Sequence, residues 1–169
     1  NLSLNFFGLE AKRNSLGFRT NRVDQIDPGE ERDLIKGDFS NYGIEGRILK
    51  NYEINNVKNY LLLGFKIYNS NSASEQGPGS GNSNADFEFD FNNYPNYVNQ
   101  SNYRYPNNNL AIFGENIFYI NEKLSVTPGF RYENIVTNNI GFYRKINTDA
   151  AGNVIYNERF DENDSRKRS

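Results

Sequence analysis

The most constraining feature of this sequence is a set of five segments in which apolar and polar residues alternate with a period of two. The clearest covers residues 42–54, where apolar side chains recur at every second position and only Lys50 interrupts them. The other four cover residues 2–9, 59–68, 110–120 and 123–137. This period is typical of β-strands, and no segment has a convincing 3.6-residue helical period. The sequence therefore predicts an all-β protein of about five strands.

The connections between these segments alternate between long and short. Only "NNVK" separates the second strand from the third, and only "NEK" separates the fourth from the fifth. The other connections are expected to be long loops, at residues 11–41, 69–109 and 138–169. A soluble β-sandwich has no such rule, whereas an outer-membrane barrel has short periplasmic turns and long extracellular loops.

The alternation alone fits a half-buried soluble sheet equally well. A membrane barrel is favoured by three features: the alternation of long and short connections, the polar residues on the face opposite the apolar one, and the aromatic residues at the strand ends. Barrel strands need about 9–11 residues to cross the bilayer. We therefore expect an antiparallel up-and-down meander of about five transmembrane strands.

Composition excludes several function classes. The chain has no Cys and no His, which excludes disulfides, thiolate metal sites and imidazole bases. Its net charge of −2 argues against a nucleic-acid partner, which prefers clustered Lys and Arg. Aromatic residues make up 15% of the chain, which disordered proteins rarely reach. We expect an ordered protein that is not an enzyme and has no cofactor or metal site.

One hairpin resembles a known family. The segment "LSVTPGFRYENI", residues 124–135, resembles the "TPGxRxE" strand of TonB-dependent outer-membrane receptors, in the ferric-citrate-receptor branch. With the residues before it, "AIFGENIFYINEK", it resembles that strand with its preceding partner and the turn between them. Two further stretches resemble a strand start of that branch and the loop leading into it, "NYGIEGRI" and "RTNRVDQIDPGEERDLIKGDF".

The resemblance implies a section of a 22-stranded outer-membrane β-barrel that imports a ferric chelate such as ferric citrate or a siderophore. Import would be energised by the TonB complex through an N-terminal region. No segment matches a plug domain or a TonB box, so we expect an internal fragment of roughly a quarter of the barrel. The alternatives are a soluble Tyr/Asn-rich β-domain that binds glycans and an importer of sugar oligomers on the same barrel.

The period of two divides the strand residues between a lipid face and a lumen face. Seven residues are expected on the lipid face and exposed: Ile44, Ile48, Leu61, Leu63, Phe65, Phe130 and Tyr132. Four are expected to face the lumen: Glu45, Arg47, Arg131 and Glu133. The two arginines could line a ligand path or pair with the two glutamates in the barrel wall.

The ligand candidates lie in the expected long loops. An anionic chelate would be bound by guanidinium groups, which bind carboxylates bidentately, and the loops offer Arg19, Arg22 and Arg104. Gln76, Gln100 and Tyr103 could add neutral hydrogen bonds. Ordinary surface exposure is the alternative for each of these six residues.

Four other segments carry predictions. Pro128 with Gly129 indicates a bulge or bend, or the position just before the strand proper. Residues 75–91 fit a mobile extracellular loop better than a carboxylate-pair active site. Residues 140–160 are expected to form an extracellular hairpin turning at residues 149–153. Residues 161–165, "DENDS", fit a solvated acidic loop better than a calcium loop.

Overall fold

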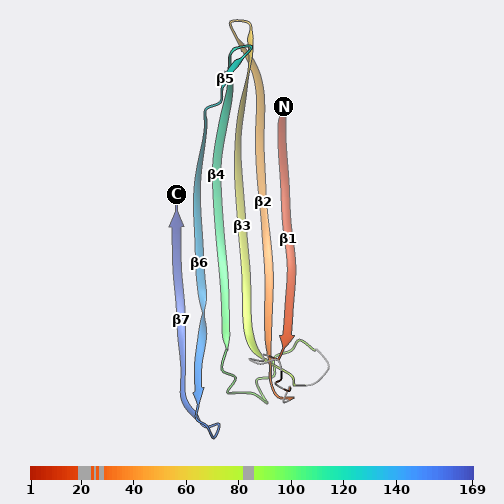
Figure 1. Cartoon of the computed structure of the whole chain (residues 1–169), viewed down its shortest axis with the longest axis vertical. Coiled ribbons are helices and arrows are strands. Elements are labelled where there is room, and N and C mark those ends of the chain that lie inside the picture. The colour runs from red at the N-terminus through yellow and green to blue at the C-terminus, as the bar shows by residue number, and fades with distance from the viewer. Residues whose placement is uncertain (19–23, 25, 27–28, 82–85) are drawn as a thin grey trace.

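The fold of this chain is a single antiparallel sheet (Figure 1). A computed structural model describes residues 1–18, 24, 26, 29–81 and 86–169. Within these residues there is no helix, and seven strands are present: β1 (Leu2–Gly17), β2 (Arg32–Ile54), β3 (Val57–Gly79), β4 (Ser101–Asn121), β5 (Leu124–Val126), β6 (Gly129–Thr148) and β7 (Val154–Arg168). The prediction of an all-β protein is confirmed.

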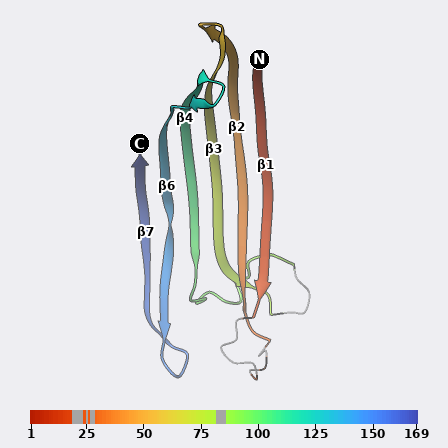
Figure 2. The same cartoon turned by 45° about the horizontal axis from the view of Figure 1, so that its top comes forward.

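The strands form an open meander in which each long strand pairs with the next one along the chain. The order is β1-β2-β3-β4-β6-β7, and the short β5 pairs with the end of β4. Tight connections lie at one end of the sheet, after β2 and β4, and the longer connections lie at the other end, here called the loop end (Figures 1 and 2). In the part of the chain that the structure describes, no helix is long and apolar enough to cross a membrane.

The strands are much longer than predicted, and the expected long loops are largely part of the sheet. Residues 11–17 pair with residues 33–39 across β1 and β2. Residues 69–76 pair with residues 101–108 across β3 and β4. The loop predictions for residues 11–41, 69–109 and 138–169 were therefore wrong where strands occupy them, at residues 11–17, 32–41, 69–79, 101–109, 138–148 and 154–168. The physical reason is that backbone hydrogen bonds extend a ladder through Ser- and Asn-rich rows that have no apolar alternation to detect.

The predicted fifth strand is two strands, and β7 extends the second arm of the predicted hairpin to Arg168. Pro128 separates β5 from β6 and lies directly before β6, which confirms the expectation that it precedes the strand proper. Its carbonyl oxygen accepts a hydrogen bond from Asn116 N at 2.9 Å, while proline has no N–H to donate. The predicted hairpin is confirmed, because β6 and β7 pair and the chain turns at residues 149–153. Residues 161–165 lie within β7 and not in an acidic loop.

The register assigns neighbouring residues to opposite faces, named here the Ile48 face and the Arg47 face. Opposite partners share a face, so Ile48 and its row partners Leu2 and Leu63 lie together. An apolar band crosses the Ile48 face, formed by Leu2, Leu4, Phe6, Tyr42, Ile44, Ile48, Tyr52, Ile54, Leu61, Leu63, Phe65, Ile67, Leu110, Ile112, Phe130 and Tyr132. These side chains form a continuous apolar surface over five strands.

Most of the apolar band is exposed. Ile48 and Tyr132 are each 53% exposed, and Phe130 is 59% exposed. Among the seven residues expected to be exposed, only Ile44 and Leu61 are half-buried by their neighbours. Within the described residues, the buried apolar side chains are few and scattered: Leu34, Tyr97, Ala111 and Ile146. Ile48 and Phe130 therefore do not pack into a dry core between two sheets.

Candidate ligand-binding face

The Arg47 face carries charged pairs at the level of the apolar band. Arg47 Nη2 lies 2.6 Å from Glu45 Oε1, and Arg131 Nη2 lies 2.5 Å from Glu133 Oε1. Each pair joins residues two apart on one strand, so both members lie on the same side. The four residues predicted to point away from the apolar band do so. Of the two roles left open for the arginines, the structure has them paired with the glutamates.

A phenylalanine ring lies between the two arginines. Arg47, Gly64, Phe113 and Arg131 form one row across four strands. The guanidinium carbons of Arg47 and Arg131 lie 5.9 and 5.4 Å from the centre of the Phe113 ring, within reach of a cation–π contact. A Cβ at Gly64 would lie 2.4 Å from the ring, so glycine is what allows the ring to lie flat over β3.

Closer to the loop end, the Arg47 face becomes rich in tyrosine. The rings of Tyr103 and Tyr105 stack at 6.0 Å on β4. The Tyr103 hydroxyl reaches over Gly141 to donate a hydrogen bond to Glu162 Oε2 at 3.1 Å, and Asn139 Nδ2 donates to the same oxygen at 3.3 Å. Burial and the Glu162 carboxylate raise the pKa of Tyr103 to about 12. Tyr103 therefore stays a neutral phenol at physiological pH.

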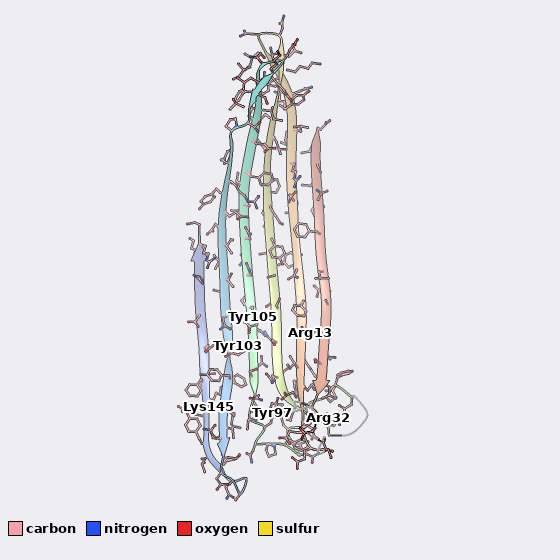
Figure 3. All side chains as sticks on the ribbon, viewed as in Figure 1. Arg13, Arg32, Tyr97, Tyr103, Tyr105 and Lys145 are labelled. Atoms are coloured by element: carbon pink, nitrogen blue, oxygen red, sulfur yellow. The ribbon has the colours of Figure 1, made fainter. Side chains whose placement is uncertain are left out.

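The segment between β3 and β4 is fixed to the sheet by Tyr97. This side chain is 4% exposed. Its hydroxyl donates to Asp33 Oδ1 and accepts a hydrogen bond from Gln76 Nε2 at 3.2 Å. Figure 3 places Tyr97 at the loop end, beyond Tyr103 and Tyr105 on β4. The bonds to β2 and β3 hold the segment beside the polar surface.

A hollow of about 970 Å³ opens at this end of the sheet. Its lining residues include Gln76, Gln100, Tyr103, Tyr143 and Lys145. Arg144 also borders it, but strand alternation places the Arg144 side chain on the Ile48 face, where Nη1 donates to Asn157 Oδ1 at 3.2 Å. Among the described residues, no Asp or Glu lines the hollow. Amide, phenol and cationic donors around one hollow suit a ligand that carries many oxygen acceptors and negative charge.

The structure brings together half of the predicted ligand residues. Gln76, Gln100 and Tyr103 share the hollow. Arg104 does not join them, because the alternation turns it onto the Ile48 face while its neighbours Tyr103 and Tyr105 lie on the Arg47 face. Arg19 and Arg22 lie outside the described residues, so their roles stay predictions.

Sequence reasoning missed three residues of this region. Tyr143 and Lys145 were assigned to an extracellular hairpin without a face, although the alternation of residues 139–147 would have placed them beside Tyr103. Nothing in the local sequence marks Tyr97, because its position depends on the path of a long segment. The site is therefore built by strand parity together with one tertiary contact.

The acidic residues after β3 have ordinary structural partners. Glu88 forms an ion pair with Lys36 at 3.4 Å. Asp86 Oδ1 accepts a hydrogen bond from Glu88 N at 3.1 Å, and Asp90 accepts one from Asn93 N at 3.3 Å. In the ranges that the structure describes, no group of three or more acidic residues could hold a metal ion. These carboxylates shape a connection between strands.

Comparisons with protein-family models, with curated proteins and with solved structures found no match for this chain. The functional argument therefore depends on the residues and their arrangement.

Proposed function

We propose that this sheet is a section of the wall of an outer-membrane β-barrel, in an active transporter that imports a ferric chelate. The observation that carries the proposal is the apolar band on the Ile48 face. Its side chains cross five strands and most remain exposed, while two of these strands, β2 and β6, carry charged pairs on the other face. Exposed apolar surfaces of this extent mark contact with lipid or with another protein.

The height of the band suits a bilayer. On β2 it extends from Tyr42 to Ile54, which is about 40 Å along the strand at ~3.3 Å per residue. A strand tilted by about 45° would cover ~28 Å of membrane depth in that length. Outer-membrane barrels have an apolar band about 25 Å tall, bordered by aromatic residues. Tyr42 and Tyr52 lie near the two borders of this band.

The edges of the sheet suit a larger assembly. β1 and β7 are the outermost strands of the described sheet. Open edges within lipid leave backbone groups without hydrogen bonds, which the bilayer does not tolerate. Further strands of a closed barrel would pair with both edges. The resemblance of residues 111–135 to TonB-dependent receptors supports a 22-stranded barrel and a TonB complex as the energising partner.

The loop-end hollow supports an anionic cargo. Lys145 lines it, and among the described residues no Asp or Glu does, although the whole chain carries a net charge of −2. A ferric chelate with carboxylate groups offers many acceptors to this cation and to the surrounding amides. The stacked rings of Tyr103 and Tyr105 favour a second cargo class, sugar oligomers, which bind on aromatic surfaces.

Two matched tryptophan substitutions test the membrane assignment. The chain has no Trp, so Phe65→Trp and Phe113→Trp each add a single indole to this section of the receptor, at nearly the same level but on opposite faces. The signal of each is the difference in fluorescence from the unmodified receptor. In the complete receptor, reconstituted with lipids brominated on their acyl chains, we expect strong quenching for F65W and little for F113W. Equal quenching of the two variants, or none of F65W, would reject the membrane wall.

The cargo is tested separately. Lys145→Ala should weaken equilibrium binding of ferric citrate to the detergent-purified receptor by about tenfold, because a charged hydrogen bond is lost. Lys123→Ala, in the tight turn at the far end of the sheet, is the matched control and should leave binding unchanged. The same assay on the Arg19→Ala/Arg22→Ala double variant tests those two residues. Unchanged affinity in K145A would exclude the hollow as the chelate site.

A further inference from the structure

We propose that Arg104 and Lys12 form a site on the Ile48 face that binds the phosphorylated sugar headgroup of an outer-leaflet glycolipid. The inference rests on the proposed membrane function, because it needs the apolar band to be embedded in lipid. It concerns a different surface from the loop-end hollow and a ligand that is not transported.

The position of the site follows from the register. The row that ends the apolar band contains Gly8, Tyr42 and Asn69. Two rows further toward the loop end, Lys12, Asp38, Ala73 and Arg104 lie side by side on the same face. This step of four residues is about 13 Å along the strand, or ~9 Å of depth at a tilt of about 45°. Headgroups occupy that zone of a bilayer.

The surface at this level is hollowed and carries a free guanidinium group. A depression of about 530 Å³ is lined by Lys12, Ser40, Asn71, Ala73 and Arg104, together with Glu10 and Asp38. Arg104 is exposed, and among the described residues its guanidinium group has no ion-pair or hydrogen-bond partner. The small side chain of Ala73 beside it leaves room for a ligand.

The second cation is only loosely held. Lys12 Nζ lies 3.8 Å from Asp38 Oδ1, and the two side chains are 84% and 64% exposed. Such an exposed pair contributes little stability, so a phosphate group can replace the carboxylate as the partner of Lys12. Arg104 can bind the same phosphate through two parallel hydrogen bonds.

The rest of the depression favours a sugar headgroup over a simple anionic phospholipid. Its two cations are balanced by the carboxylates of Glu10 and Asp38, so these four residues give it no net positive charge that would attract a simple anionic phospholipid. Ser40 and Asn71 bring a hydroxyl and an amide to its wall, and Ser40 Oγ donates to Glu10 Oε1 at 2.5 Å. Carboxylates, amides and hydroxyls hydrogen-bond to sugar hydroxyl groups, while the guanidinium selects the phosphate. The combination matches a phosphorylated glycolipid.

The test measures binding of a fluorescent, bisphosphorylated glucosamine-disaccharide lipid to the complete receptor in detergent micelles. We expect Lys12→Ala/Arg104→Ala to weaken binding by roughly ten- to hundredfold, through loss of charged hydrogen bonds. Arg13→Ala/Arg166→Ala removes two cations from the Arg47 face and should bind as the unmodified chain does. Arg104→Lys, which keeps the charge without the planar fork, should bind with intermediate affinity.

Two comparison lipids identify the source of the recognition. The glycolipid stripped of its phosphates, and phosphatidylglycerol without a sugar, should each bind at least tenfold more weakly than the intact glycolipid. Equal affinities for phosphatidylglycerol and the glycolipid would overturn the proposal, as would equal losses in the two double variants. If F65W is quenched by brominated lipid but K12A/R104A binds the glycolipid normally, this inference fails alone. If F65W is not quenched, the membrane assignment fails and this inference fails with it.

Discussion

The two halves of β3 show how differently one strand can present its side chains. In the half near the tight turns, Leu63, Phe65 and Ile67 alternate with Gly64 and Lys66, so one face is apolar and the other is not. In the half near the loop end, residues 69–76 are Ser, Asn, Ala, Glu and Gln, and both faces are polar. Yet the strand pairs with β2 in a single unbroken register through both halves.

The comparison shows that backbone pairing and side-chain chemistry are independent along this strand. The backbone ladder fixes which residues lie opposite one another, and it needs no apolar side chains to continue. The side chains indicate which environment each half suits. A row of exposed apolar side chains is favoured where lipid or another protein, and not water, covers it. The loop half carries polar side chains on both faces and is suited to water on both.

The largest effect is expected when a charge is placed in the middle of the apolar band. Leu63 lies in the central row of the band, opposite Ile48. Leu63→Arg should destabilise the receptor in lipid vesicles by about 2–4 kcal/mol, the cost of a cation on a lipid-facing strand at the bilayer midplane. Urea unfolding in vesicles measures the free energy.

The matched control lies on the same strand and the same face, in the loop half. Asn71→Arg should change the free energy of unfolding by no more than about 0.5 kcal/mol, because its site faces water or headgroups. Equal losses in the free energy of unfolding for Leu63→Arg and Asn71→Arg would show that the two halves of β3 do not lie in different environments.

Crowding the Phe113 ring tests the charged face of the band half. Gly64→Ala places a methyl group 2.4 Å from Phe113 Cζ, so the ring must leave its position between Arg47 and Arg131. We expect a loss of about 1–3 kcal/mol in the free energy of unfolding, typical of overpacking. Gly17→Ala, where nothing lies within 4 Å of the added atom, should cost almost nothing. A harmless Gly64→Ala would mean that the ring is not held there.

The sequence predicted the band half well and the loop half poorly. The apolar and charged faces of residues 42–54 were readable, because each alternate position differs in chemistry. Residues 32–41 were assigned to a loop, since their apolar residues do not alternate over enough positions to reveal a strand. What extends the strand there is pairing with β1 and β3, which no local pattern encodes.

The candidate site divides in the same way. Gln76 and Tyr103 were found by chemistry alone, and the structure brings them into one hollow. The face of Arg104 could not be predicted, because a residue assigned to a loop is given no face, while a residue on a strand must face opposite to its neighbours. The position of Tyr97 could not be predicted, since it depends on how the segment after β3 folds back onto Asp33.

The Tyr97 anchor offers a smaller test, of the loop half alone. Tyr97→Phe removes the hydroxyl that bridges Asp33 and Gln76. We expect a local loss of about 1 kcal/mol, the typical net contribution of such hydrogen bonds. Hydrogen exchange should be faster at the Asp90 amide, which donates to Pro78 O of β3, and at the Tyr94 amide, which donates to Asp90 O. Global stability should change little. Tyr94→Phe is the control, and equal exchange rates in the two variants would mean that Tyr97 is no anchor.

The smallest effect is expected at the tip of the β6–β7 hairpin, the point of the loop half furthest from the band. The Asp149 carboxylate accepts hydrogen bonds from Asn153 Nδ2 at 3.0 Å, Asn153 N at 2.8 Å and Ala151 N at 2.9 Å. These bonds, with the Asn153 side chain first, hold the pKa of Asp149 below its ordinary value. A lowered pKa means that the stabilisation is present above the ordinary value and is lost as the pH falls through the lowered one.

Acid should therefore open this turn while the sheet stays folded. The amides of Ala151 and Asn153 should lose protection from hydrogen exchange only at pH values below about 4, the ordinary range of an aspartate. Asp149→Asn keeps an oxygen acceptor but cannot titrate, so the protection of these two amides should become independent of pH. If acid removes the protection of these amides equally in D149N and in the unmodified chain, a group other than Asp149 controls the turn. Because the side chain is fully exposed, neither variant should shift the unfolding midpoint of the whole sheet.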